Sequence, residues 1–234
     1  MQAYDPAFAY EVAEIVKDGL RRMYGDDPED IFYYLTLYNE PYKQPEMPEG
    51  AAEGIVRGLY KFADAPEGCR HRATIFFSGT AQGAAREAQQ LLAEHHDVGA
   101  ELWSVTSYKS LREDALSAER WNRLHPTEQP QVPYVTEALA DAEGPFVAVT
   151  DFMKAVPDQV ARWVPGTFLP LGTDGYGRSD TRANLRHHFE TDAPNVVVAV
   201  LQAVAQSGEG KQEAVADAIA RYELDTEAPD PRIA

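Results

Sequence analysis

The sequence predicts an α/β protein in which a mostly parallel sheet lies between helices. The main observation is that short apolar segments alternate with amphipathic helical segments from residue 73 to residue 222. A second observation is the polar stretch at residues 39–50, whose three prolines favour an extended linker. We therefore expect a domain boundary within this stretch, with a short part before it and a longer part after it.

Composition limits the class of protein. The chain has 234 residues and a net charge of −17, which repels phosphate backbones and anionic membranes, so neither nucleic acid nor a membrane is the expected partner. No apolar run approaches the roughly 20 residues of a membrane span, and the first residues show no secretory signal. The single cysteine, Cys69, excludes an intrachain disulfide and fits a reducing cytoplasm. We expect a cytoplasmic protein.

The leading part contains one predicted helix and one predicted strand. Asp5 as N-cap, Pro6 at the first helical position and Gly25 as a left-handed stop indicate a helix between them. Residues 31–38 are rich in aromatic and β-branched side chains and predict a buried strand. Because these two elements cannot close a core alone, the leading part is interpreted as the tail of a domain whose beginning is missing. Exposed apolar surface on residues 5–42 should make the lone chain self-associate.

The second part shows the alternating pattern. The predicted strands are 73–77, 100–105, 146–150 and 167–171. The predicted helices are one ending near residue 95, then 108–124, 134–141, 153–163, 194–204 and 214–222. Residues 225–234 are polar, and we expect an extended strap or a disordered tail.

The segment from Leu171 to Asp192 is the strongest candidate for a functional site. A glycine-rich turn follows a strand and enters a helix that Ser179 or Asp180 could cap, but its spacing matches no phosphate-binding motif. Basic residues concentrate there in an otherwise acidic chain. We expect acidic side chains of this domain or of a partner surface to pair with these basic residues. Ion pairing at a subunit contact is favoured over a substrate role. The candidate residues of an interface or active-site rim are Arg178, Asp180, Arg182, Arg186, His187 and His188.

Other catalytic or metal chemistry finds little support. Neighbouring helical residues point about 100° apart, so His187 and His188 are not expected to chelate one metal ion. Ser78 lacks a nucleophile elbow, and its expected role is helix capping together with Thr80. Cys69 lies in a polar loop, where a lone thiol is usually inert or merely oxidisable.

Several long stretches carry a resemblance to a known family. They are similar, in order, to the end of the E1 subunit of homodimeric bacterial pyruvate dehydrogenases. The stretches are DPAFAYEVAEIVKDGLRRMYG (5–25), FYYLTLYNEPY (32–42), LWSVTSYKSL (102–111), RWNRLHP (120–126), PYVTEAL (133–139), VPDQVARWVPG (156–166), LGTDGYGRSDTRANLRHHFETDA (171–193) and VADAIARYELD (215–225).

The resemblance implies a domain assignment and an activity. Residues 1–48 would be the tail of the thiamine pyrimidine-binding domain with its linker, and residues 49–234 a transketolase C-terminal-like domain. The complete enzyme would decarboxylate pyruvate on thiamine diphosphate with Mg²⁺ and reductively acetylate the lipoyl group of its E2 partner. The implied partners are upstream E1 domains or a companion chain that carries them, a second E1 protomer, and the E2 dihydrolipoyl acetyltransferase.

The family's catalytic and cofactor residues lie upstream of the matched segment. Asp174 and Gly175 superficially resemble its Gly-Asp-Gly element, but Thr173 interrupts the motif and Asn184 follows too closely. We therefore assign no catalytic, cofactor or metal residue here, and we expect the isolated chain to be inactive and to bind no cofactor. The residues that select the 2-oxo acid should also lie upstream. The alternatives are a stand-alone dimerisation or docking module, or one chain of a split transketolase-like enzyme acting on another 2-oxo acid or a ketose.

Overall fold

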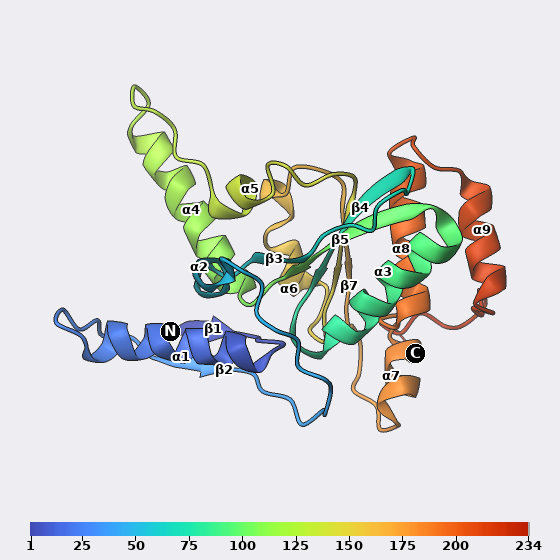
Figure 1. The fold of residues 1–234 in the computed structure, drawn as a ribbon, viewed down its shortest axis with the longest axis horizontal. Helices are drawn as coiled ribbons and strands as arrows, with labels where there is room; N and C mark the ends of the chain where they lie inside the picture. Colours follow the sequence, from blue (N-terminus) through green and yellow to red (C-terminus); the bar gives the residue numbers. More distant parts are fainter. Residues whose placement is uncertain (234) are drawn as a thin grey trace.

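The computed structural model, which describes residues 1–233, contains a five-stranded sheet flanked by helices and a separate pair of strands (Figure 1). The order of the larger sheet is β3-β5-β4-β6-β7, with β3 antiparallel to β5 and the other neighbours parallel. The predicted α/β fold with a mostly parallel sheet is confirmed. Its strands are β3 (Tyr60–Ala63), β4 (His71–Phe77), β5 (Val98–Ser104), β6 (Phe146–Val149) and β7 (Phe168–Leu171).

The sheet reverses its winding direction beside β4. Helix α3 (Gln82–His96) leads from β4 to β5 on one side of it. The chain then passes through α4 (Tyr108–Leu124) and α5 (Tyr134–Ala138) and returns to β6 on the other side of β4. Ile75 of β4 accordingly pairs with Leu102 on one side and with Val147 on the other. The carboxyl ends of β4 and β6 therefore border a topological switch point.

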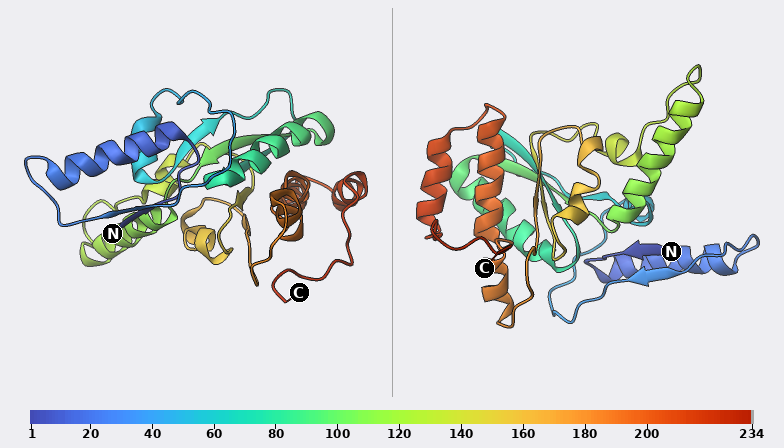
Figure 2. Two further views of the ribbon diagram at one scale, coloured as in Figure 1. Left: turned by 90° about the horizontal axis from the view of Figure 1, so that it is seen from below. Right: turned by 180° about the vertical axis from the view of Figure 1, so that it is seen from behind.

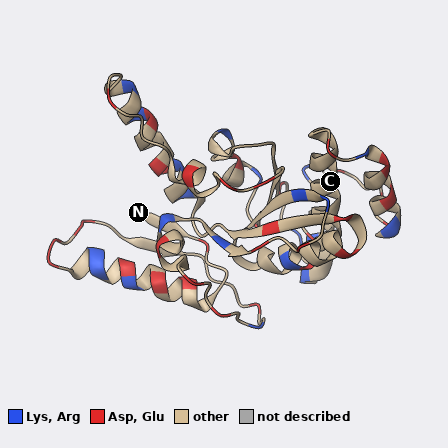
Figure 3. Cartoon of the chain, turned by 45° about the horizontal axis from the view of Figure 1, so that its top comes forward, with Lys and Arg blue, Asp and Glu red and all other residues tan. Residues whose placement is uncertain are grey.

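Helices cover both faces of the sheet, as two further views show (Figure 2). On one face the core is built with α3, α8 (Ala193–Gln206) and α9 (Gln212–Arg221). On the other face it is built with α4, α5 and the turns α6 (Ala155–Asp158) and η2 (Ala161–Trp163). Residues 73–77 of β4 are buried toward both faces, which explains their continuous apolar run. Charged residues lie mainly on the helices and loops (Figure 3).

The N-terminal segment forms a small unit at one side of the sheet (blue in Figure 1). Strands β1 (Gln2–Tyr4) and β2 (Tyr33–Leu35) pair in parallel, joined through α1 (Ala9–Tyr24). Just before α1, Phe8 is buried in the main core, where its ring stacks on Phe62 of β3 at a centroid distance of 5.1 Å. This small unit and the larger sheet therefore share a core.

A buried carboxylate also joins the two parts. Glu11 of α1 is fully buried and accepts four hydrogen bonds. Two come from the backbone amides of Ala7 and Phe8, at the start of the helix. The other two come from the hydroxyls of Tyr60 in β3 and Ser104 in β5, each at 2.7 Å. Burial raises the pKa of Glu11, and the four donors act against that rise.

Several predictions for the leading part were wrong. The first helix begins at Ala9 with Phe8 at its N-cap, because the Asp5 carboxylate accepts a hydrogen bond from Tyr38 instead of capping the helix. Gly25 has an extended backbone, with a φ of −74°, and is not a left-handed stop. The strand predicted at residues 31–38 is shorter, Tyr33–Leu35, and it is not buried in the structure of residues 1–233. The exposed fractions of the Phe32 and Tyr34 side chains are 61% and 58%.

The second part follows the prediction more closely. The predicted helix at 153–163 is instead divided into α6 and η2. Pro157 has no amide hydrogen to donate to the Met153 carbonyl, and from Gln159 to Val164 the backbone hydrogen bonds, such as that from the Val160 amide to the Pro157 carbonyl, span three residues rather than four. Four elements were not predicted from the sequence: β1, α2 (Ala51–Arg57), β3 and the short η1 (Gly79–Ala81). From residue 225 to residue 233 the chain contains turns but neither a helix nor a strand. None of the helices described in residues 1–233 has the length and apolar character needed to cross a membrane.

Candidate functional site

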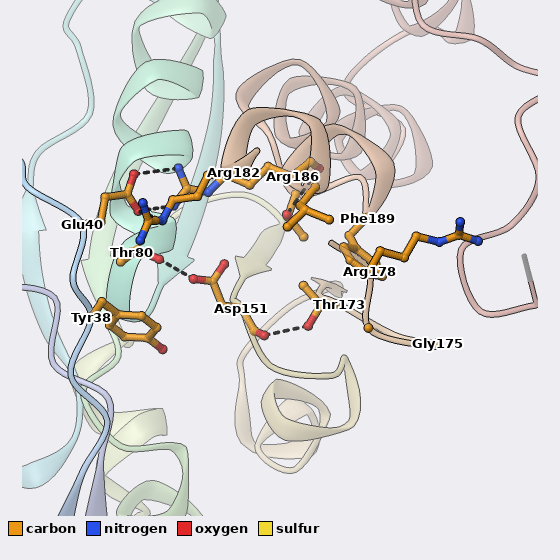
Figure 4. A pocket seen from close by; sticks show the side chains of 13 residues that line it. Tyr38, Glu40, Thr80, Asp151, Thr173, Gly175, Arg178, Arg182, Arg186 and Phe189 are labelled. Atoms are coloured by element: carbon orange, nitrogen blue, oxygen red, sulfur yellow. Dashed lines mark hydrogen bonds and ion pairs between the residues drawn. The ribbon is translucent and has the colours of Figure 1, made fainter. Parts of the chain in front are cut away.

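A cavity of about 310 Å³ lies beyond the carboxyl ends of the parallel strands (Figure 4). Thr80 follows β4, Asp151 follows β6, and Thr173 follows β7, and all three line it. The N-terminal segment contributes Tyr38 and Glu40 from the opposite side. The remaining wall comes from the glycine-rich turn and from α7 (Arg182–His188).

Hydrogen bonds between strand ends fix the floor of this cavity. The Ser78 and Thr150 hydroxyl oxygens lie 2.9 Å apart and link the ends of β4 and β6. The Thr80 hydroxyl donates to Asp151 Oδ2, and the Thr173 hydroxyl donates to the Asp151 carbonyl oxygen at 2.6 Å. Ser78 does occupy the N-cap position of η1, but the predicted capping by the Ser78 and Thr80 hydroxyls was wrong, because both hydroxyls bond to the neighbouring strand end.

The N-cap of α7 lies one residue after Asp180 and two after Ser179, the two caps proposed from the sequence. Thr181 is the N-cap, and its hydroxyl accepts the amide hydrogen of Asn184 at 3.3 Å. Asp180 accepts hydrogen bonds from the Thr181 amide and from the Asn184 side chain, and these bonds lower the pKa of Asp180. Neither Ser179 nor Asp180 is thus the N-cap, although Asp180 still braces the first turn.

Two arginines on one face of α7, Arg182 and Arg186, are paired with an acidic side chain of the same chain, Glu40. Arg186 donates two hydrogen bonds to the Glu40 carboxylate, at 3.1 and 2.6 Å, and this interaction raises the pKa of Arg186. Arg182 Nε lies 3.8 Å from Glu40 Oε2, and Arg182 also donates to Asn39 Oδ1 at 2.5 Å. The cluster therefore fastens the linker to α7. A role at a subunit contact stays a prediction.

The other candidate residues divide between the cavity and its surroundings. Arg178 lines the cavity at the end opposite Glu40 (Figure 4) and has no hydrogen bond or ion pair with another residue of the described chain. His187 Nδ1 lies 2.9 Å from Asp192 Oδ2. His188 packs edge-on against Phe189, with ring centroids 4.9 Å apart. Of the six candidates, only Arg178, Arg182 and Arg186 line this cavity.

The residues that approach the cavity from the strand ends and from the linker were not predicted from the sequence. The available signal for Thr80, Asp151 and Thr173 was their position directly after apolar strands. Tyr38 donates a hydrogen bond to Asp5 Oδ1 at 2.6 Å, and burial raises the pKa of both residues, that of Asp5 to about 6. No local pattern indicated this contact.

The described residues do not fit a metal–diphosphate site. Residues 1–233 contain no group of three or more His, Cys, Asp or Glu side chains placed to hold a metal ion. Asp174 Oδ1 accepts the Lys154 amide hydrogen at 2.9 Å and so braces the turn. Gly175 has a φ of +98°, and a Cβ at this glycine would lie 2.2 Å from the Pro231 carbonyl oxygen. The turn is therefore shaped by packing against the C-terminal segment.

Comparisons with known proteins identify the fold and its family. Residues 58–192 match the family described as the transketolase-like TK C-terminal domain. The chain belongs to this family. Residues 1–45 match the family described as the pyruvate dehydrogenase E1 component middle domain.

Individual relatives are more specific. The chain is 51% identical over 223 residues to the pyruvate dehydrogenase E1 component of Mycolicibacterium smegmatis, covering 95% of this chain and 24% of that protein. It is 49% identical over 233 residues to the same component of Escherichia coli K12, covering 99% of this chain and 26% of that protein. The resemblance to this component is confirmed. The chain corresponds to a C-terminal portion of these relatives and spans about a quarter of their length.

Solved structures agree on the fold. A transketolase from Pichia stipitis superposes with a TM-score of 0.58 at 16% identity, covering 89% of this chain and 26% of that one. A transketolase from Leishmania mexicana gives a TM-score of 0.55 at 16% identity, covering 88% and 25%. At this identity the likeness concerns the fold alone.

Proposed function

We propose that this chain acts as the C-terminal segment of a pyruvate dehydrogenase E1 component. The observation that carries the proposal is the identity of about half of all residues over nearly the whole chain. The complete protein would decarboxylate pyruvate on thiamine diphosphate with Mg²⁺ and pass the acetyl unit to the lipoyl group of E2. Its setting would be the cytoplasm, and its partners the upstream E1 portion, a second E1 protomer and E2.

Within that enzyme the segment would have a supporting role. We place the division of the proposed domains between residues 48 and 49, and the two family matches, 1–45 and 58–192, support this division. Glu11 and the Glu40–Arg186 pair join the two parts from opposite ends of the N-terminal segment. Through these contacts the C-terminal domain would fix the orientation of the middle domain and support the dimer, while the cofactor would be held upstream.

The first experiment uses the isolated chain. Titration calorimetry with thiamine diphosphate and Mg²⁺ should give no saturable heat, and pyruvate oxidation should be absent. Clear saturable binding would contradict the supporting role.

A second experiment tests the identity of the segment. The corresponding portion of the Escherichia coli E1 component is replaced by this chain, and pyruvate-dependent NADH formation is measured with the remaining subunits of the complex. We expect activity in the chimera and none in a matched deletion. A chimera that folds and binds thiamine diphosphate but oxidises no pyruvate would refute the proposal.

A further inference from the structure

A second cavity, of about 170 Å³, lies where the N-terminal segment meets the larger sheet, and we call it the junction cavity. Tyr4, Asp5 and Tyr34 line it from the N-terminal segment. Tyr108, at the start of α4, and Phe152, which follows β6, line it from the other part. It shares no lining residue with the cavity beyond the carboxyl ends of the strands.

Two polar atoms of residues that line the junction cavity are buried without a hydrogen-bond partner. Asp5 and Tyr108 are only 6% and 5% exposed. Asp5 Oδ2 and the Tyr108 hydroxyl oxygen are closed off from solvent, and neither forms a hydrogen bond with a residue in the part of the chain that the structure describes. Asp5 Oδ1, by contrast, accepts the hydroxyl hydrogen of Tyr38. Buried polar groups are costly without partners, so two of them beside one cavity indicate a site for a ligand.

The two atoms together call for a hydroxyl group. Burial and then the nearby Asp5 charge raise the pKa of Tyr108, so the two groups lie near each other. An ionised carboxylate has only acceptors, whereas a tyrosine hydroxyl has a donor. A ligand hydroxyl can donate to Asp5 and accept from Tyr108 at the same time. An ammonium group has only donors and would leave the Tyr108 hydrogen without an acceptor.

The other polar groups of the lining already have partners. The Thr106 and Ser107 hydroxyls donate to backbone carbonyl oxygens, each at 2.6 Å. The Lys109 ammonium group is paired with the Glu113 carboxylate at 2.5 Å. The hydroxyl of a ligand is therefore directed to Asp5 and Tyr108.

The rest of the lining favours an apolar, aromatic ligand body. Four aromatic side chains line the cavity, and Val105 and Val156 add aliphatic surface. Aromatic rings pack well against one another in offset or edge-on arrangements. Apolar protein cavities of about 150 Å³ admit a molecule the size of benzene, so a cavity of about 170 Å³ can hold one ring with one small substituent.

We propose that the junction cavity binds a small neutral aromatic alcohol of the size of phenol, whose hydroxyl donates to Asp5 Oδ2 and accepts from Tyr108. Tyr34 is 58% exposed, so its side chain is free to move aside as the ligand enters. Because Asp5 belongs to the N-terminal segment and Tyr108 to α4, the bound molecule joins the two parts. The inference goes beyond the proposed E1 function, since neither the cofactor nor pyruvate enters it.

The test is a titration of the ¹⁵N-labelled chain with phenol, followed by backbone amide chemical shifts. Burial raises the pKa of Asp5 to about 6, so the titration is run at about pH 7.5, where this carboxylate is ionised. Toluene has the same shape without the hydroxyl and is the matched control ligand. We expect saturable shifts with phenol at a dissociation constant of about 1 mM or below, and binding of toluene that is weaker by at least about tenfold.

Three variants locate the site. Tyr108→Phe keeps the ring and removes the donor, so it should weaken phenol binding about tenfold and leave toluene binding unchanged. Tyr176→Phe, at a tyrosine that is 84% exposed and lies outside the cavity, should change neither. Val156→Phe fills the cavity and should abolish the phenol shifts.

Three outcomes would overturn the proposal. One is the absence of a saturable phenol shift up to about 10 mM. The others are equal binding of toluene and phenol, and phenol binding to Tyr108→Phe as tight as to the wild type. Ordered water would then satisfy Asp5 and Tyr108 in place of a ligand.

Discussion

Replacing Glu11 by alanine should destabilise the chain by about 3–5 kcal/mol, because the change leaves four hydrogen-bond donors in the core without an acceptor. The amides of Ala7 and Phe8 are fixed by the backbone and cannot turn elsewhere, and each unsatisfied amide costs about 1–3 kcal/mol. The Tyr60 and Ser104 hydroxyls can rotate and lose less. The variant also no longer has to bury a charge, and this regains part of the desolvation cost. The expected destabilisation is therefore smaller than the cost of four lost hydrogen bonds.

The assay is urea unfolding followed by circular dichroism. Glu11→Gln keeps one acceptor and the side-chain shape, so it should cost about 1–2 kcal/mol, and Ser104→Ala about 1 kcal/mol. The control is Glu87→Ala, at an exposed glutamate in α3, which should stay within about 0.5 kcal/mol of the wild type. A loss below about 1 kcal/mol for Glu11→Ala would refute the reasoning that this carboxylate joins the two parts.

Three further predictions concern ionisation, ion pairing and association. Burial raises the pKa of Asp5 from 3.8 to about 6, so its contribution to the free energy of unfolding is present below about pH 4 and is lost as the pH rises through about 6. The wild type should lose up to about 3 kcal/mol over this range relative to Asp5→Asn. Glu40→Gln and Arg186→Gln should show a coupling of about 1–2 kcal/mol in a double-mutant cycle, since both side chains are about three-quarters buried and the contact is bidentate. Light scattering should show self-association of the chain that Leu20→Lys reduces and Val132→Lys does not, although the two side chains are similarly exposed, at 55% and 59%.

Each of these has a result that would count against it. A pH-independent difference between Asp5→Asn and the wild type would mean that Asp5 ionises normally in the folded chain. Additive single and double variants would show that Glu40 and Arg186 are not coupled. A wild-type chain that stays monomeric at modest concentration would contradict the exposed apolar surface on α1 as an association site.

Local periodicity was enough to predict most of the fold. The strands of the sheet centre and the long helices have strong apolar patterns, because each is buried against the sheet along its length. The missed elements β1 and β3 are short, with three and four residues, and owe their structure to partners elsewhere in the chain. The start of α1 was misplaced because Asp5, a typical capping residue, is held by Tyr38 instead.

The candidate site could be predicted only in part. The basic cluster and the glycine-rich turn were visible, since both belong to one continuous segment. The partner of Arg186 was not, because Glu40 lies 146 residues away and no spacing rule connects them. Asp151 followed a recognisable strand, but its role depends on which other strand ends lie beside it, and that order is a property of the sheet topology.

The position of β1 has a consequence for synthesis on the ribosome. The Ala3 carbonyl accepts a hydrogen bond from the Ser107 hydroxyl, which lies 104 residues later in the chain. At translation rates of about 5–20 residues per second, this partner emerges roughly 5–20 s after the first strand. Until β5 is complete, Glu11 of α1 also lacks the hydroxyl donors that β3 and β5 supply. We therefore expect the contacts between the N-terminal segment and the larger sheet to form only after β5 has been synthesised.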